Sequence, residues 1–338
     1  MKITLDDVAK EAGVSRATVD RVLNERGNVS PITVERVHRA LYTTNYWLSD
    51  EDDTPKKIYD FDFIFPTPHT RYLDFYSRLI EAIKQSYNGQ QVNARFHRVE
   101  AFNPNALAQK LQQIGTNTDG IAFAAYEHPT VRKAVDELVA KGVGVATLVS
   151  DISSTSRISY VGINNRAAGR TAGLLMGRFL GKQTNGKIGL FLGSHAYLGH
   201  EEREAGFRGL IREQFPNLRI VEMPELLDND DRAQDLTASA LQEESNLVGI
   251  YNVGGGTEGI AQTLKNLDLA DKLIFIAHEL FDNTKAHLLD GTIDVILNQD
   301  VKHEAFNAIE VLISHKEGRP LSSGTTEPQV EIYLAENI

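Results

Sequence analysis

The sequence contains no cysteine among its 338 residues. Without thiols the chain can hold no disulfide framework, no zinc–thiolate site and no catalytic cysteine. It also lacks an uninterrupted apolar run of about 18 residues, which a membrane-spanning helix needs. The opening stretch, MKITLDDVAKEAG, has no apolar core of the kind found in secretory signals. We therefore expect a cytoplasmic protein with no membrane partner.

Basic side chains are also scarce, because 35 Lys and Arg stand against 46 Asp and Glu and the formal net charge is −11. This balance argues against a protein that coats nucleic acid over its whole surface. Residues 1–49 differ, with seven basic and six acidic side chains. A small DNA-reading head on an acidic body fits this distribution, provided that the basic side chains of the head point the same way.

The first fifty residues predict three short helices. Thr4 and Asp7 have the spacing of a capping box, and Gly13 suits a tight turn after the first helix. Ser15 can cap a second helix with its apolar residues on one side, and the Ser-Pro pair at 30–31 can start a third. The pattern is that of a helix-turn-helix. A three-helix domain that binds no DNA has the same pattern.

Beyond an acidic stretch broken by Pro55, short apolar runs alternate with amphipathic segments. Strands are predicted at 60–65, 120–125, 142–149, 187–193, 247–253 and 272–278. Helices are predicted at 72–87, 104–114, 129–141, 165–180, 200–214, 230–243, 257–267, 283–290 and 301–316. This alternation predicts parallel, doubly wound α/β sheets, and about 280 residues suffice for two similar lobes.

The predicted organisation is a small all-α helix-turn-helix head followed by a two-lobed α/β domain. The head covers residues 1–49, an acidic linker or hinge covers 50–59, and an effector-binding and dimerisation domain covers 60–338. Within the last, the first lobe takes about 60–163 and 300–322, and the second about 164–299 and 323–338. Ligands of such sheets bind beyond the carboxyl ends of the strands.

Several stretches resemble one known family. TLDDVAKEAGVSRATVDRVLN and VSPITVERVHRALYTTNY, which span residues 4–46, are similar to the DNA-binding head of the lactose/galactose repressor family. The remainder resembles the family's effector domain, a fold shared with periplasmic sugar-binding proteins, through YVGINNRAAGRTAGLLM, REAGFRGL, IFIAHE and DGTIDVILNQD. The resemblance implies a transcriptional regulator that acts as a repressor, is not an enzyme and needs no cofactor. It also implies a homodimer that binds a near-palindromic, double-stranded DNA operator and a sugar or polyol effector.

The resemblance assigns base reading to Arg16, Ala17 and Arg21 on the second helix. Arginine can bond guanine bidentately and alanine can contact a thymine methyl group. The resemblance assigns contacts with the DNA backbone to Thr18, Asn24 and Ser30. The alternative for Arg16 is a solvated ion pair with Asp20, four residues along the helix.

Two features depart from the family pattern. The family usually carries a small hydroxyl residue where this chain has Asp20, which can accept a hydrogen bond from a cytosine amino group or hold the neighbouring arginines in place. We favour the second role. The family's hinge helix, which wedges a leucine into the minor groove, is replaced by WLSDEDDTP. Either the hinge is not used, or Trp47 and Leu48 supply the wedge; Trp47 is otherwise a core residue.

The resemblance places the effector between the lobes. The residues it implies are Arg203, Asn252, Glu279, Gln299, Tyr72, Phe75, Asp151 and Asn164. Carboxylate, amide and guanidinium groups beside an aromatic face suit a polyhydroxylated ligand. Glu279 stands where the family has aspartate, and Val253 where an aspartate often follows the asparagine. A sugar alcohol or cyclitol is therefore as reasonable as a hexose or pentose.

Two other stretches have the pattern of a different kind of site. Gly254, Gly256 and Gly259 form a dinucleotide fingerprint between a strand and a helix, which would make the chain a redox-sensing regulator that binds a nicotinamide dinucleotide. HELFD begins like a zinc-protease motif, but Asp282 stands where the second histidine is required. His195, His200 and Glu201 could meet a metal ion, but the intervening AYLG has the pattern of a loop. We expect no metal.

Overall fold

The computed structural model describes residues 3–23, 29–44, 46, 58–67, 74, 76–80, 91–321 and 328–338. The predicted helical segment at 72–87 and the linker therefore lie largely outside the described residues. No helix in the described part of the chain is both long and apolar enough to cross a membrane.

The head contains three helices, α1 (Leu5–Ala12), α2 (Arg16–Leu23) and α3 (Pro31–Thr43). The predicted capping box is confirmed, because the Thr4 backbone N–H donates to the Asp7 carboxylate at 2.8 Å while the Thr4 hydroxyl accepts from the Asp7 N–H. Gly13 has the predicted left-handed conformation, with φ of 62°. The buried side chains of the head are Val8, Ala9, Ala12, Val19, Val22, Val37, Ala40 and Leu41. They come from all three helices, so the head has a core of its own.

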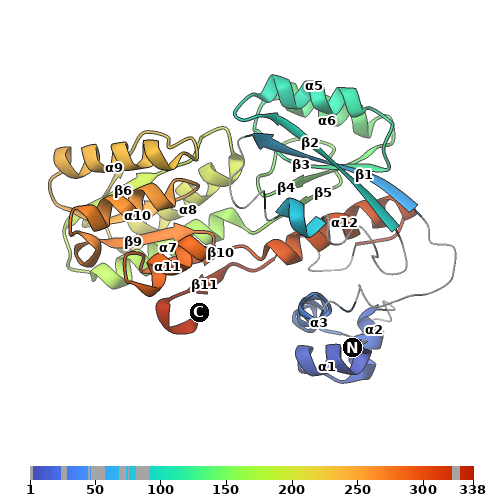
Figure 1. Ribbon diagram of the computed structural model, residues 1–338, viewed down its shortest axis with the longest axis horizontal. Coiled ribbons are helices and arrows are strands. Elements are labelled where there is room, and N and C mark those ends of the chain that lie inside the picture. Colours follow the sequence, from blue (N-terminus) through green and yellow to red (C-terminus); the bar gives the residue numbers. More distant parts are fainter. Residues whose placement is uncertain are drawn as a thin grey trace. The chain divides into compact units, whose positions relative to one another are not determined.

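The rest of the chain carries two sheets. The chain separates into two compact units, unit 1 with Met1–Gly162 and Asp300–Pro328, and unit 2 with Ile163–Gln299 and Gln329–Ile338. The strands of unit 1 are β1 (Ile58–Thr67), β2 (Gln91–Glu100), β3 (Gly120–Ala124), β4 (Gly144–Leu148) and β5 (Ser159–Val161). They form one parallel sheet in the order β2-β1-β3-β4-β5. Helices α5 (Pro104–Ile114) and α6 (Pro129–Val139) cover one face, and α12 (Val301–Glu317) covers the other (Figure 1).

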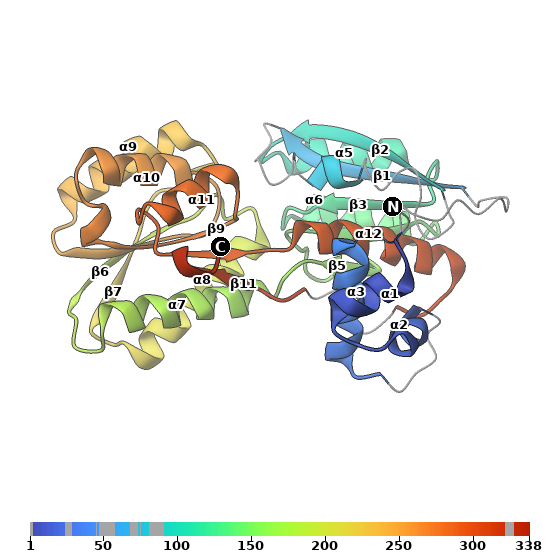
Figure 2. The ribbon, with the colours of Figure 1, turned by 60° about the horizontal axis from the view of Figure 1, so that its bottom comes forward.

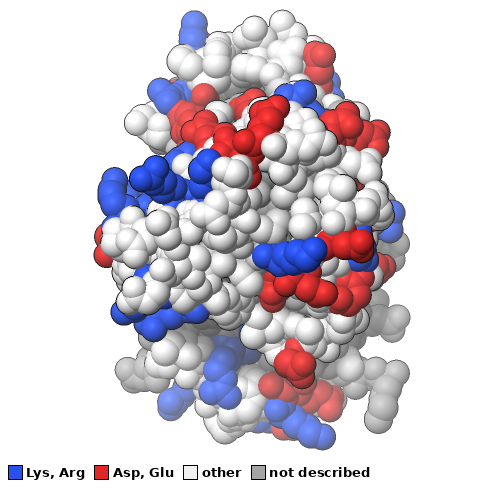
Figure 3. Space-filling view, turned by 90° about the vertical axis from the view of Figure 1, so that its left-hand side faces the viewer, with Lys and Arg blue, Asp and Glu red and all other residues white. Residues whose placement is uncertain are grey.

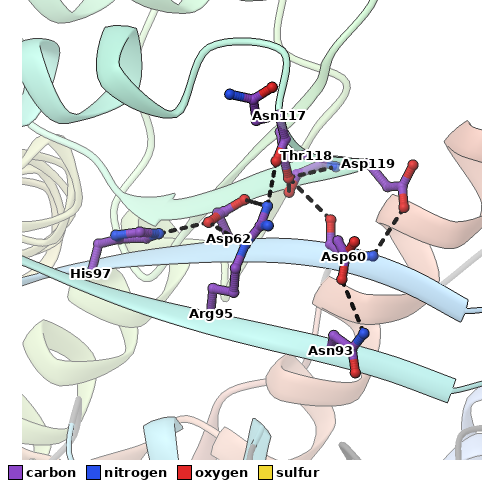
Figure 4. Close-up of polar contacts among 9 residues, drawn as sticks. Asp60, Asp62, Asn93, Arg95, His97, Asn117, Thr118 and Asp119 are labelled. Carbon is purple, nitrogen blue, oxygen red and sulfur yellow. Dashed lines mark hydrogen bonds and ion pairs between the residues drawn. The ribbon is translucent and has the colours of Figure 1, made fainter.

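A polar network joins β1 to the edge strand β2 (Figure 4). Asp62 is 1% exposed, and its carboxylate accepts from Arg95 Nε at 3.0 Å and Arg95 Nη2 at 2.5 Å. His97 Nε2 lies 2.6 Å from the same carboxylate. Arg95 also donates to the carbonyl oxygen of Asn117 at 2.6 Å. Because Asp62 and Arg95 are register partners in the parallel pair, the ion pair matches the alignment of β2 on β1.

Unit 2 has a second sheet in the order β11-β10-β9-β8-β6-β7. Its strands are β6 (Gly186–Phe191), β7 (Leu218–Glu222), β8 (Leu247–Asn252), β9 (Ile274–His278), β10 (Val295–Asn298) and β11 (Glu331–Tyr333), of which only β11 pairs antiparallel. Its helices are α7 (Asn165–Leu180), α8 (Leu198–Gln214), α9 (Asp230–Glu243), α10 (Thr257–Asn266) and α11 (Asp282–Leu289).

Each face of the unit 2 sheet has its own hydrophobic core. Side chains of α7 and α8 pack with Ile188 and Tyr251 on one face, and side chains of α9, α10 and α11 pack with Ile250 and Phe275 on the other. Figure 2 shows these helices from a second direction. The doubly wound parallel sheets predicted from the sequence are confirmed. Covered on both faces, the unit 2 sheet leaves its edges and strand ends for polar groups.

Candidate functional site

The head exposes one side of α2. Arg16, Ala17 and Arg21 are exposed, while Val19 and Val22 are buried in the core of the head. Ser15 caps the helix, since its hydroxyl accepts from the Thr18 N–H at 3.1 Å. The three side chains assigned to base reading are thus free to enter a groove, as the prediction requires.

Arg16 forms an exposed ion pair with Asp6 of α1, with Nη1 and Oδ2 3.1 Å apart. The two side chains are 64% and 65% exposed, and such surface pairs contribute little to stability. Exchanging Asp6 for a guanine edge therefore costs Arg16 little.

Two hydroxyls assigned to the DNA backbone lie at helix starts. Thr18 and Ser15 share a hydrogen bond at 2.8 Å, and Ser30 caps α3 by accepting from the Thr33 N–H at 3.2 Å. Asn24 lies outside the described residues. Helix starts present backbone N–H groups to anions, so a phosphate contact is compatible with both capping roles.

The turn between α1 and α2 is held from α3. Arg36 Nη2 donates to the Ala12 carbonyl at 2.5 Å and to the Gly13 carbonyl at 3.2 Å. A Cβ atom at position 13 would lie 2.6 Å from that nitrogen. The positive φ of Gly13 favours glycine at this turn, whereas the end of the Arg36 side chain could move to make room for a Cβ atom.

In unit 2, Arg203 is a buried arginine with protein partners on two of its nitrogens. Its side chain on α8 is 3% exposed; Nε donates to Asn165 Oδ1 at 2.7 Å and Nη1 donates to the Val253 carbonyl at 2.9 Å. These contacts hold the guanidinium beside the carboxyl end of β8, with the geometry set before any ligand arrives.

Asn252 ends β8 and is fully buried. Its Nδ2 donates to the carbonyls of Gly254 and Gly255, at 2.9 and 3.2 Å, and to the Thr257 hydroxyl at 2.9 Å. The two carbonyls fix the orientation of the amide, because carbonyl oxygens can only accept. Its Oδ1 is buried without a hydrogen-bond partner.

Glu279 and Gln299 lie at the ends of the neighbouring strands β9 and β10. Gln299 is 1% exposed and its Nε2 donates to Glu279 Oε1 at 2.7 Å. Glu279 Oε2 and Gln299 Oε1 are buried without partners. Burial raises the pKa of Glu279 to about 7, against the opposing influence of Arg203 and Gln299. The backbone φ of Glu279 is 74°, a left-handed value that costs free energy in a residue other than glycine.

Asp228 and His200 approach the same strand ends. The Asp228 carboxylate accepts from the Gly255 N–H at 2.9 Å, and burial raises its pKa. A Cβ atom at Gly254 would lie 2.7 Å from His200 Cε1. Burial, reinforced by Arg203, lowers the pKa of His200 to about 3, so this histidine is neutral at physiological pH.

These contacts explain the glycines of the alternative dinucleotide site. The Gly255 N–H already binds the Asp228 carboxylate, where a pyrophosphate would need free N–H groups. A Cβ atom at Gly259 would lie 1.9 Å from the Asp230 carbonyl, so this glycine permits α9 and α10 to pack. Close packing is thus sufficient reason for the glycine pattern. Among the described residues there is also no group of three side chains able to hold a metal ion.

Two family models match the chain. The periplasmic binding protein domain matches residues 63–320, and the lacI family of bacterial regulatory proteins matches residues 4–48. The sucrose operon repressor of Lactococcus lactis subsp. lactis is 28% identical over 313 residues, which is 86% of this chain and 94% of that protein. The chain belongs to the lacI family of bacterial regulatory proteins.

Other lacI-family proteins match shorter segments. Catabolite control protein A of Priestia megaterium is 29% identical over 170 residues, covering 50% of this chain and 49% of that protein. Maltose regulon regulatory protein MalI of Vibrio furnissii is 44% identical over 45 residues, covering 13% of this chain and 33% of that protein. The sequence identity to MalI is thus higher, but it covers only a segment about as long as the DNA-binding head.

Solved structures show the fold of the larger part. GanP, a glucose-galactose binding protein of Geobacillus stearothermophilus, has a TM-score of 0.74 at 19% identity, covering 84% of this chain and 99% of its own. A solute-binding protein of Burkholderia graminis in complex with D-arabinose also has a TM-score of 0.74, at 22% identity, covering 85% and 98%. The family and the two-lobed fold expected from the sequence are confirmed.

In this lacI-family protein, only some of the residues expected to bind the effector lie together at the carboxyl ends of the unit 2 strands. Asp151 in unit 1 accepts from Thr147 Oγ1 at 2.6 Å and from Arg157 Nε at 2.5 Å, so both partners use its carboxylate. Asn164 is exposed and caps α7 by accepting from the Ala167 N–H at 2.9 Å. Tyr72 and Phe75 lie outside the described residues. The strand-end cluster therefore consists of Arg203, Asn252, Glu279 and Gln299, joined by Asn165, Asp228 and His200.

Proposed function

We propose that this lacI-family regulator represses an operon for the catabolism of a carbohydrate or polyol. In this proposal a small polyhydroxylated effector, a sugar, sugar alcohol or cyclitol, binds the strand-end cluster of unit 2. One observation carries the proposal: the same chain has a helix-turn-helix head with exposed arginines and a buried polar cluster with unpartnered acceptors. The relatives named as sucrose operon repressor and maltose regulon regulatory protein support the same class.

DNA binding is assigned to the head alone. On the face of the described residues drawn in Figure 3, basic and acidic side chains form small separate groups with uncharged surface between them. A surface of this kind gives phosphate no continuous basic field. Arg16 and Arg21 of α2 are therefore the proposed readers, with the operator's two half-sites bound by a homodimer.

The effector acts on DNA binding through a difference in affinity. A ligand can shift the equilibrium between two states of the regulator only by as much as it prefers one of them. The effector releases the operator if it binds more tightly to the state that does not bind DNA. It strengthens operator binding if it binds more tightly to the DNA-binding state.

Two measurements test the proposal. A binding-site selection with the full-length protein should return a near-palindromic sequence. Thermal unfolding against pentoses, hexoses, polyols and cyclitols should then show a stabilising ligand, since a ligand at 100 times its Kd adds about 2.7 kcal/mol to the folded state. Random selected sequences would reject the DNA assignment, and a panel in which only nicotinamide cofactors stabilise would favour the redox-sensing alternative.

A further inference from the structure

The strand-end cluster of unit 2 contains two carboxyl groups but only one permanent cation. Its ionisable groups are the carboxyls of Asp228 and Glu279, the guanidinium of Arg203 and the imidazole of His200. The imidazole of His278, which ends β9 directly before Glu279 and is 1% exposed, is counted with them. Arg203 is the only permanent cation among these five. Burial lowers the pKa of both histidines, so they are neutral and do not offset the carboxylates. Two carboxylates and one guanidinium leave one negative charge without a partner when both acids are ionised.

Three oxygens of the cluster are buried acceptors without a hydrogen-bond partner. They are Asn252 Oδ1, Glu279 Oε2 and Gln299 Oε1. Asn252 is 0% exposed and Gln299 is 1% exposed. Their amide orientations are fixed, because Nδ2 of Asn252 faces two carbonyls and Nε2 of Gln299 faces a carboxylate oxygen. When Glu279 is ionised, all three of these oxygens can only accept hydrogen bonds.

The acceptors occur on three neighbouring strands. Asn252 ends β8, Glu279 follows β9 and Gln299 follows β10, and these strands are adjacent in the order β10-β9-β8. Adjacent strands lie about 4.8 Å apart, so the acceptors form a short row along one sheet edge. A partner for this row must supply several donors at close spacing. A buried acceptor without a partner has lost its hydrogen bond to water and gained none in return, so a ligand that satisfies all three is favoured.

We propose that the effector is a polyol bearing a primary amine, an amino sugar or an aminocyclitol, whose ammonium group binds Glu279 and the neighbouring acceptors. This inference rests on the proposed function and narrows its ligand class. An ammonium group supplies three donors and no acceptor. It also supplies the positive charge that Arg203 alone does not. A hydroxyl in the same place brings a lone pair that would itself need a donor, and a phosphate or carboxylate adds to the negative charge.

Glu279 links this preference to pH. Its pKa is about 7, so the carboxylate is mostly protonated at pH 6 and mostly ionised at pH 8. The charged groups that bear on it are Arg203 from α8 and Asp228 from the segment before α9, with Gln299 as its hydrogen-bond donor. Since the ammonium ion binds the ionised form, its affinity should rise by up to about tenfold from pH 6 to pH 8. A neutral polyol should show no such rise.

The test uses matched ligands and the full-length protein in thermal unfolding and calorimetric titration. D-glucosamine is compared with D-glucose and with N-acetyl-D-glucosamine, and 1-amino-1-deoxy-D-sorbitol with D-sorbitol. The amine of 1-amino-1-deoxy-D-sorbitol stays protonated at pH 8, so this ligand is used to measure affinity between pH 6 and pH 8. We expect at least one amine to bind about tenfold or more tighter than its neutral counterpart.

A pair of variants separates the local cause from a general effect of charge. Glu279→Gln keeps the size of the side chain but removes the charge, and it should abolish both the amine preference and its pH dependence. Glu243→Gln, an exposed residue at the end of α9, should leave both unchanged.

The outcomes are distinct. Equal or tighter binding of the neutral counterparts, or of glucose 6-phosphate, would overturn the inference and leave the proposed function in place. Silence of every amine would also overturn it. An amine preference that survives Glu279→Gln would place the ammonium elsewhere and reject the assignment. Failure of the proposed function would appear separately, as loss of operator selection.

Discussion

Arg203 shows how a single residue of unit 2 prepares the site before a ligand is present. Its guanidinium is buried and donates hydrogen bonds to the side-chain oxygen of Asn165 and to the carbonyl of Val253. Two nitrogens, Nε and Nη1, hold it to the protein. The position of the side chain is thus set by unit 2 itself.

Arg203→Met should therefore weaken folding as well as effector binding. The variant removes two buried hydrogen bonds, at a cost of about 2–4 kcal/mol in the free energy of unfolding. Urea unfolding of the full-length protein measures this. Arg170→Met is the matched control, because it removes an arginine from an exposed ion pair with Glu213 and should change stability little. Equal losses in both variants would contradict the structural role of Arg203.

Sequence reasoning located part of this cluster and missed the rest for physical reasons. Arg203, Asn252, Glu279 and Gln299 were expected from the resemblance to the family, and Asn252 and Glu279 also lie at the ends of predicted strands. Asp228 was missed because it lies in a loop after β7, with a φ of 52° that no strand pattern signals. Asn165 was missed by one position, because pattern cannot distinguish the exposed cap Asn164 from the buried residue that follows it.

At the head, Arg16→Ala should relax base preference at one position in each half-site. Removing a bidentate contact to guanine costs about 1–3 kcal/mol, which a binding-site selection and titrations on the selected sites measure. Asp6→Ala removes the ion-pair partner of Arg16 and serves as the control. It should leave base choice intact. If Arg16→Ala weakened binding equally on all sequences, Arg16 would be a phosphate contact instead.

At the scale of whole elements, helices were easier to predict than edge strands. The predicted bounds of α5, α7 and α9 match the structure residue for residue. Strand β2 was not predicted, because it alternates polar and apolar residues and so lacks the continuous apolar run by which the other strands are recognised. That alternation follows from its place at the sheet edge, where the polar side carries Arg95 and His97.

The Asp62 network should anchor β2 in a pH-dependent way. Burial by itself raises the pKa of Asp62, but hydrogen bonds from Arg95, Thr118 and His97 outweigh burial, and the net pKa is lowered. A lowered folded-state pKa means that this stabilisation is present above the unfolded pKa of about 3.9 and is lost as the pH falls through the folded value.

Asp62→Asn should accordingly lower the free energy of unfolding by about 1–3 kcal/mol at pH 7. Below about pH 4 the difference between variant and parent should shrink, since the parent carboxylate becomes protonated as well. Urea titrations between pH 3 and pH 7 measure the difference. Asp231→Asn, at an exposed carboxylate of α9, should show neither effect. A difference that stays constant over the whole pH range would mean that charge is not the cause.

For the whole molecule, the central question is how one small head achieves specificity. A single α2 helix with two arginines reads only a few base pairs. The near-neutral charge of residues 1–49 gives little additional affinity for the phosphates. Pairing two heads squares the discrimination of one, which is the physical reason to propose a homodimer for this regulator.

The spacing of the half-sites tests that proposal. Two heads in successive major grooves require half-site centres about 34 Å apart, or about one helical turn of DNA. Inserting five base pairs between the half-sites turns one of them to the opposite side of the duplex. Affinity in a gel-shift titration should then fall by about tenfold or more, to that of an isolated half-site, because only one head can bind. Substituting five central base pairs at unchanged length is the control. If the insertion leaves affinity unchanged, the heads bind independently, and specificity must come from contacts within a single half-site.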